Sequence, residues 1–302
     1  GAASLSAGPS SLRASLLAVG MGAGFYLPSG LATLTASVPK SLWGRAIGVH
    51  EVAPNSAFIL APVVAELLLQ GATWRGGLRA VAAAILLAGA LFAWRCPQGN
   101  VRGKPPQSAA LKRLGRDPDF WRMSLLFSLG ITGTLGVYAM LPLFLVNEHG
   151  FSQAGANLLF AASRVSTLAT ALLGGWATDR FGVRRTMGTA LAASGICTVL
   201  LGVAPRWAVP VLLFLQPVLA VAFFPAGFAS LAGIGPPESR SLVVAFTVPL
   251  AFLLGGGGAP LLVGWMGESG RLGLGLSLAG GLIALGALLV RGLRPQRSGR
   301  KP

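Results

Sequence analysis

The chain carries a charged turn at residues 175–185, which reads Gly175-Trp-Ala-Thr-Asp179-Arg180-Phe-Gly182-Val-Arg184-Arg185. One acid and three arginines stand together here, between two long segments made mainly of Leu, Ala, Val and Gly. Short basic turns between long apolar segments are typical of helices that cross a lipid bilayer and return. The turn therefore indicates a protein that is embedded in a membrane.

Apolar segments continue on both sides of this turn along the whole chain. Of 302 residues, 53% are hydrophobic and 11% are charged, a composition that excludes an ordinary soluble domain. A hydrocarbon core about 30 Å thick needs about 20 apolar residues in a helix. Nine spans meet this requirement, and they are residues 14–37, 44–70, 75–95, 121–147, 153–177, 187–204, 207–234, 240–264 and 271–291.

The spans predict helices rather than the strands of a membrane barrel. Barrel strands are about 10 residues long and alternate in polarity, whereas these runs are longer and carry Leu and Ala on every face. The 43 glycines suit helices that pack closely in lipid. The predicted fold class is therefore an all-α, polytopic membrane protein.

The basic residues fall mainly on one side of these spans. If the 44–70 helix enters from the cytoplasm, eighteen of the 24 Lys and Arg residues lie in cytoplasmic connections and five lie outside. The positive-inside rule then predicts a multi-pass protein of the inner membrane with a cytoplasmic C-terminus. Because this topology explains the net charge of +16, the bilayer is the expected partner and nucleic acid is not.

A polar, basic stretch divides the chain. We expect residues 96–120 to link a bundle at 1–95 to a six-helix bundle at 121–291, followed by a basic cytoplasmic tail at 292–302. An internal repeat supports this division, because Pro28-Ser-Gly-Leu-Ala-Thr-Leu and Pro225-Ala-Gly-Phe-Ala-Ser-Leu align at a constant spacing of 197 residues. That spacing predicts three further helices before Gly1, so we expect about nine helices of a complement of twelve. A native nine-helix protein is the alternative.

Two six-helix halves, a basic connection and the pattern Gly-x-x-x-Asp-Arg-x-Gly-x-Arg-Arg resemble the major facilitator superfamily of secondary transporters. The pattern resembles the cytoplasmic motif that this family carries after its eighth helix. The resemblance implies a conformational latch in which Asp179 meets the start of the 44–70 helix near Gly44 and Arg45. A basic loop that only sets the topology is the alternative. The latch residues would be Gly175, Asp179, Arg180, Gly182, Arg184 and Arg185, with the arginines pairing with acids or lipid phosphate.

Ionisable residues inside the spans are the candidates for substrate binding, because burying a charge in lipid is costly. Arg164 lies near the middle of its span, where it could bind an anionic group of a substrate or pair with a carboxylate of a neighbouring helix. The expected carboxylate is Glu51, and either Glu51 or His50 could instead couple transport to protons. The weaker candidates for a cavity are Asn157, Tyr138 and Gln216.

These residues and the resemblance predict a monomeric secondary transporter that moves a small solute by rocking two bundles around a midplane site. The solute would be anionic, zwitterionic or a drug-like efflux substrate, and proton coupling stays open. A degenerate relative that acts as a receptor, a regulator or a remnant is the alternative. The cysteines and histidines have no metal-binding spacing and no nucleotide-binding motif occurs, so we expect no catalytic residue, metal, cofactor or enzymatic activity.

Overall fold

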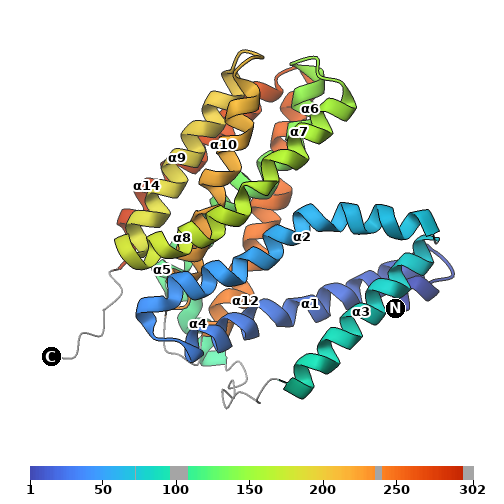
Figure 1. Cartoon of the computed structure of the whole chain (residues 1–302). Helices are drawn as coiled ribbons and strands as arrows, with labels where there is room; N and C mark the ends of the chain where they lie inside the picture. Colours follow the sequence, from blue (N-terminus) through green and yellow to red (C-terminus); the bar gives the residue numbers. More distant parts are fainter. Residues whose placement is uncertain (72, 96–107, 235–239, 295–302) are drawn as a thin grey trace.

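The computed structural model describes residues 1–71, 73–95, 108–234 and 240–294, and this part of the chain is built from helices (Figure 1). Two short 3₁₀ turns, Ala2–Leu5 and Lys40–Leu42, precede α1 and α2. Two π-helical segments, η3 (Thr132–Gly136) and η5 (Phe252–Gly258), interrupt longer helices. The α-helices are α1 (Pro9–Ser37), α2 (Trp43–Gly71), α3 (Trp74–Arg95), α4 (Ser108–Arg116), α5 (Pro118–Ile131), α6 (Val137–Asn147), α7 (Gln153–Val165), α8 (Thr167–Phe181), α9 (Val183–Val203), α10 (Val209–Val221), α11 (Phe223–Leu231), α12 (Arg240–Ala251), α13 (Ala259–Glu268) and α14 (Leu272–Arg291).

The all-α fold class is confirmed, because each expected span coincides with one helix or with helices joined end to end. Within the described residues, eight such helices are long and apolar enough to cross a membrane. The remaining span, 44–70, corresponds to the 29-residue helix α2, whose side chains are described only in part. The chain is therefore a multi-pass helical membrane protein.

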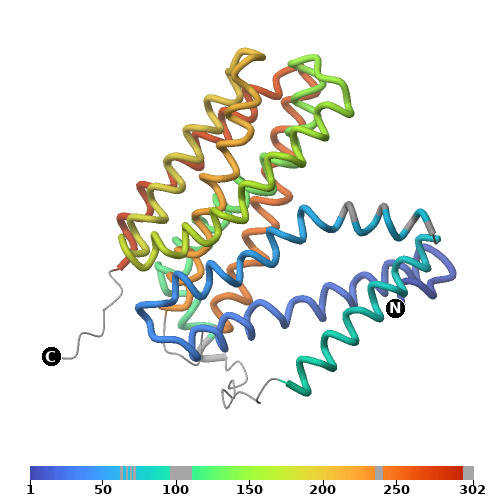
Figure 2. The backbone as a smooth tube through the Cα atoms, viewed as in Figure 1, coloured from blue at the N-terminus to red at the C-terminus, as the bar shows by residue number. Residues whose placement is uncertain are grey.

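The helices form two groups that meet at one end. Helices α1 to α3 make one group and α5 to α14 make the other, and α2 lies against α8 while α1 lies against α12 (Figure 1). The backbone trace shows that the opposite ends of the two groups diverge (Figure 2). The short helix α4 lies in the expected linker and was not predicted. Residues 96–107 of that linker, and 295–302 of the expected tail, are outside the described residues.

The larger group packs around a buried aromatic core. Phe127 of α5 makes edge-to-face contacts with Phe223 and Phe228 of α11, with ring centroids 5.3 and 5.0 Å apart. All three side chains are buried. Edge-to-face aromatic pairs add stability beyond the apolar area they bury. This core holds α11 against α5 and fixes the position of the π-helical segment that follows α5.

The two π-helical segments lie against each other at a glycine contact. A Cβ atom at Gly136 would stand 2.5 Å from the carbonyl oxygen of Gly255, and a Cβ at Gly255 would collide with the backbone of Ser128. Pro249 lies inside α12 and Pro260 in the first turn of α13, so prolines flank the second segment. Proline removes a backbone donor and interrupts the helical ladder. The backbone is therefore irregular in the middle of the bundle, where the polar side chains gather.

Candidate functional site

The π-helical segment η3 offers backbone acceptors to two polar side chains. Arg164 Nη2 donates to the carbonyl oxygen of Thr134 at 3.2 Å, and Gln216 Nε2 donates to that of Gly133 at 2.8 Å. A π-helical turn departs from the regular ladder, and such irregular backbone inside a membrane protein is tolerated where side chains satisfy it. Arg164 and Gln216 therefore meet the same segment from α7 and α10.

Aromatic rings surround the Arg164 guanidinium. Its central carbon lies 3.6 Å from the centroid of the Tyr138 ring, 5.0 Å from that of Phe58 and 5.8 Å from that of Phe160. Arg164 is 5% exposed, and it lies two residues before the interruption at Ser166 that separates α7 from α8. Cation–π contacts are strongest where the cation is desolvated. The guanidinium of Arg164 is therefore buried inside the protein.

Two polar atoms of this cluster have no partner. Tyr138 Oη and Gln216 Oε1 are buried without a hydrogen bond to any described residue, although Gln216 Nε2 also donates to Thr198 Oγ1 at 3.2 Å. Buried polar atoms are nearly always paired, so unpaired ones call for an explanation such as a bound molecule. The cluster thus combines a positive charge that no described carboxylate balances with a buried tyrosine hydroxyl, which lies beside Ser163, and a free amide oxygen.

The expected ion pair between Arg164 and Glu51 is wrong. Glu51 Oε1 instead lies 3.4 Å from His50 Nδ1. The α2 residue that reaches Arg164 is Phe58, seven positions after Glu51, and seven residues of helix span about 10 Å. Glu51 therefore lies at a different membrane depth from Arg164, and the guanidinium is satisfied by the Thr134 carbonyl and the aromatic rings.

Glu51 and His50 belong to a second polar group, near the first half of α2. The Tyr26 hydroxyl of α1 lies 3.1 Å from His50 Nε2, and its ring stacks on the imidazole. Glu51 is 6% exposed, whereas His50 is half-buried. The three side chains form a continuous chain from a buried carboxylate to a surface tyrosine. Tyr26 was not predicted, and in the sequence only its position within an apolar span could have suggested it.

Asn157 stays outside both polar groups, because its side chain is exposed and accepts a hydrogen bond from Gln153 of the same helix. Sequence reasoning missed Thr134, Phe58 and Thr198, which contact the cluster through a backbone carbonyl, a ring face and a hydroxyl. Residues of these types are common in membrane helices, so nothing in the sequence marks them.

The charged turn touches α2 at the place that the resemblance predicted. The Gly44 N–H donates to Asp179 Oδ1 at 2.7 Å, and the Arg45 N–H donates to Asp179 Oδ2 at 3.0 Å. These amides belong to the first turn of α2, and a helix start favours a negative charge. The Arg45 side chain adds an ion pair at 3.6 Å, and only 7% of the Asp179 side chain is exposed.

Small residues allow α2 and α8 to approach closely beside Asp179. A Cβ atom at Gly44 would collide with the carbonyl oxygen of Gly175, and one at Gly48 would stand 2.7 Å from that of Ala171. A Cβ at Gly175 would stand 2.5 Å from the carbonyl oxygen of Gly44. Small residues let membrane helices pack backbone against backbone. The contact therefore depends on Gly175 as well as on the carboxylate of Asp179.

The rest of the turn orients a group of arginines. Gly182 has φ +88°, a left-handed conformation that favours glycine, and it separates α8 from α9. The ion pairs found among described residues include none of Arg180, Arg184 and Arg185, so the expected pairing with acids is not seen. In the described part of the chain, no group of His, Cys, Asp or Glu could hold a metal ion.

Two helical groups joined at one end, irregular backbone at mid-depth and a buried cation define a class of polytopic helical membrane protein with an internal polar site. The sequence model of the Major Facilitator Superfamily matches residues 1–164 and 136–302. Together these two matches cover the whole chain. The chain therefore belongs to the Major Facilitator Superfamily.

The curated relatives that match are less than 30% identical to this chain. An uncharacterized MFS-type transporter of Bacillus subtilis, YuxJ, is 26% identical over 59% of this chain and 47% of its own length. The probable nitrate/nitrite transporter NarK2 of Mycobacterium tuberculosis is 27% identical over 53% of this chain and 40% of its own. The chain thus spans about half the length of the curated relatives it matches.

Solved structures share the fold. The Escherichia coli fucose:proton symporter FucP superimposes with a TM-score of 0.75 at 15% identity, covering 89% of this chain and 73% of that chain. A bacterial homologue of the human lysosomal transporter Spinster, in an inward-facing conformation, gives a TM-score of 0.53 at 19% identity, covering 85% and 69%. The arrangement of helices is therefore that of the family.

Proposed function

We propose that the protein is a secondary active transporter of a small anionic or zwitterionic solute, working by alternating access. The contact between Asp179 and the first turn of α2 carries this proposal. It closes one end of the interface between the two helical groups, while the other ends diverge (Figure 1). Alternating access requires such an interface, with contacts at one end that break as contacts at the other end form.

We assign the closed end to the cytoplasm of a cell with an inner membrane. Arg45, Arg122 and Arg180 belong to this end, together with Arg184, Arg185 and Arg291. Cytoplasmic ends of membrane helices carry an excess of basic residues. The described conformation is then closed toward the cytoplasm, and the C-terminus lies on that side.

Arg164 is the residue that we assign to the solute. Its charge is buried without a carboxylate partner among the described residues, beside the free atoms Tyr138 Oη and Gln216 Oε1. A planar guanidinium suits nitrate and carboxylate groups, which it can bind with two parallel hydrogen bonds. The relative NarK2 is named as a probable nitrate/nitrite transporter, which supports an anionic solute.

Uptake of anions into proteoliposomes tests this assignment. Nitrate, nitrite and small carboxylates would be offered to wild type and to Arg164→Gln. Because a hydrogen bond to a charged group contributes about 1.5–3 kcal/mol, the variant should lose about 10- to 100-fold in uptake. Arg206→Gln is the matched control, since Arg206 also donates to a carbonyl and lies over a phenyl ring, but at an exposed loop.

Unchanged anion uptake in Arg164→Gln would contradict the role of Arg164. If no anion or drug-like solute moved with wild type, while the protein remained folded, the transporter proposal would fail. The alternative of a receptor or regulator without transport would then be the better account.

A specific contact favours proton coupling as a second element of the mechanism. Tyr26, His50 and Glu51 form a chain of polar contacts of 3.1 and 3.4 Å from the surface of α1 to a buried carboxylate. Such a chain can relay a proton. In proteoliposomes that contain a pH-sensitive dye, solute addition should move protons with wild type and not with Glu51→Gln. Equal proton movement with both would contradict the coupling role.

A further inference from the structure

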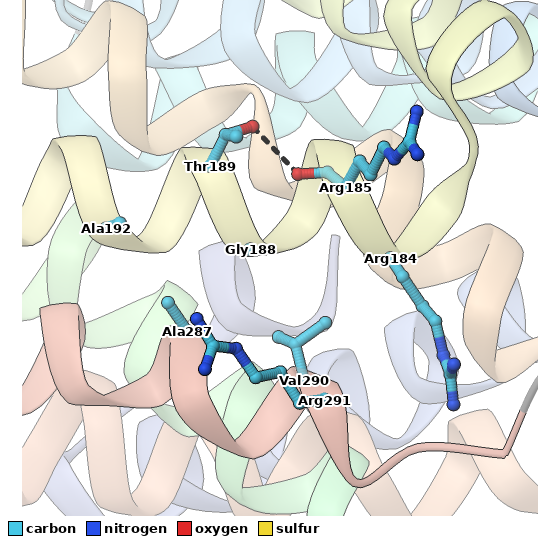
Figure 3. A pocket seen from close by; sticks show the side chains of 8 residues that line it. All are labelled: Arg184, Arg185, Gly188, Thr189, Ala192, Ala287, Val290 and Arg291. Carbon is cyan, nitrogen blue, oxygen red and sulfur yellow. Dashed lines mark hydrogen bonds between the residues drawn. The ribbon is translucent and has the colours of Figure 1, made fainter.

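A groove lies between α9 and α14 at the same end of the molecule as the Asp179 contact (Figure 3). Its volume is about 530 Å³. Arg184 and Arg185, in the first turn of α9, and Arg291, the last residue of α14, line its outer part. Three arginines therefore border the groove where two helices reach the edge of the expected hydrocarbon region, with Arg185 directed away from α14 and Arg184 past its end (Figure 3).

The inner part of the groove is apolar. It is lined by Gly188 and Ala192 of α9 and by Ala287 and Val290 of α14, and the one hydroxyl there, that of Thr189, donates to the Arg185 carbonyl oxygen. In Figure 3 the Arg291 side chain runs back along α14 toward Ala287. A Cβ atom at Gly188 would approach only Val290, at 3.9 Å, so the groove has free space beside Gly188.

The cations of the groove have no described carboxylate partner. At this end of the bundle, Asp119 is already paired with Arg122 at 3.0 Å and with Arg294 at 3.8 Å. Asp179 accepts from the first turn of α2. Arg184 Nε is buried and makes no hydrogen bond to any described residue. The local charge is therefore uncompensated by this part of the chain.

The position of the arginines on α9 is itself unfavourable for the helix. A helix start carries partial positive charge, and the first turn of α9 contains no acid to balance it. Arg184 and Arg185 thus add like charge to this end of the helix. An anion bound at the groove would relieve both the helix start and the unpartnered Arg184 nitrogen.

We infer that this groove binds an anionic phospholipid. The Arg184 and Arg291 side chains, which point to opposite sides in Figure 3, would turn toward a phosphate at the mouth of the groove, and an acyl chain would then lie along Gly188, Ala192 and Ala287. Basic pockets between membrane helices on the cytoplasmic side recognise anionic head groups through this chemistry. The apolar inner part favours a lipid over a soluble anion. The site depends on membrane embedding and not on the proposed transport activity.

Native mass spectrometry of the purified chain in detergent, with added dioleoyl phosphatidylglycerol or phosphatidylcholine, tests this site. Wild type should retain phosphatidylglycerol in preference to phosphatidylcholine. Each arginine near an anionic head group contributes about 1 kcal/mol, or about fivefold in affinity. Arg184→Gln combined with Arg291→Gln should lower retention of phosphatidylglycerol about 25-fold, and Arg271→Gln at the opposite end of α14 should leave it unchanged.

A second variant separates a lipid from a soluble anion. Ala287→Phe fills the apolar part of the groove and keeps all three arginines, so it should reduce phosphatidylglycerol retention. Inorganic phosphate at the same concentration should not displace the lipid from wild type. Equal retention of the two lipids by wild type would overturn the site. So would undiminished retention in the double arginine variant or in Ala287→Phe, or displacement by phosphate.

Discussion

Two glycine-lined helix contacts in this molecule differ in extent. Within the larger helical group, α9 and α14 touch along much of their length, at Gly195 against Gly280 and again at Gly202 against Gly273. Between the two groups, α2 and α8 share a less extensive contact, in which Gly44 and Gly48 at the start of α2 face α8. The first contact joins helices of one group, and the second joins two groups whose opposite ends diverge (Figure 1).

An acid accepts hydrogen bonds from a helix start at each contact, and the two acids differ in whether they join helices of one group or of two. Glu148 follows α6 and accepts from the Gly273 N–H at the start of α14 at 3.0 Å, so it ties together two helices of one group. Asp179 accepts at the start of α2, which belongs to the other group. The same chemical device thus joins helices of one group in one place and helices of two groups in the other. We propose that the first is a permanent cap and the second a latch, because the backbone contact around the second is less extensive.

The largest expected effect is at the more extensive contact. Gly280→Leu would drive a side chain into the backbone of α9, because a Cβ at Gly280 already lies 2.6 Å from the Val199 nitrogen. Overpacking of this kind costs about 1–3 kcal/mol, and more where backbone must move. Thermal unfolding in detergent should show a large loss of stability. Gly281→Leu is the matched control, because no atom lies within 4 Å of its Cβ, and an equal loss there would contradict a packing cause.

The less extensive contact should respond by opening rather than by unfolding. Gly48→Leu would push α2 away from Ala171, while the larger group keeps its own core. We expect a melting temperature close to that of wild type, together with greater labelling of a cysteine introduced at Thr178, which the contact buries. Gly24→Leu, with no atom near its Cβ, is the control on the smaller group. A collapse in stability would show that the contact is structural.

A double-mutant cycle sharpens the distinction between the two polar groups. Arg164 and Glu51 have separate partners, so Arg164→Gln and Glu51→Gln should have additive effects on stability, within about 0.5 kcal/mol. The cycle would be measured by thermal unfolding of both single variants and of the double variant. A coupling energy above about 1 kcal/mol would restore the ion pair that the structure lacks.

The smallest expected effect concerns His149, beside the permanent cap. Burial lowers the pKa of His149 below its ordinary value of about 6.5, although the Glu148 carboxylate opposes this shift. The unfolded chain therefore binds the proton more readily, and the stability contributed by His149 is present above about pH 6.5 and falls as the pH falls. Melting temperatures from pH 8 to pH 5.5 should decline less for His149→Gln. An identical decline in both proteins would contradict this.

The helices could be predicted because length and apolar composition suffice to define a membrane span. The partner of Asp179 could be predicted because a motif resemblance places Gly44 and Arg45 opposite it. The neighbours of Arg164 could not be predicted. The sequence gives the position of a residue along a helix, but neither the tilt nor the rotation of that helix. The sequence carries no signal for the π-helical segment Thr132–Gly136 either. Only the structure shows that carbonyl oxygens of this segment accept hydrogen bonds from Arg164 and Gln216.

The central claim is that Asp179 holds the two helical groups together reversibly, and a distance measurement tests it most directly. Spin labels at Ser41 and Phe181, both exposed and on opposite sides of the contact, would report the separation by double electron–electron resonance. Asp179→Asn should shift the distribution to longer distances, because the neutral amide loses the charge that the start of α2 favours, which contributes about 1 kcal/mol. Asp119→Asn, within the larger group, should leave it unchanged. An unchanged distribution in Asp179→Asn would contradict the latch.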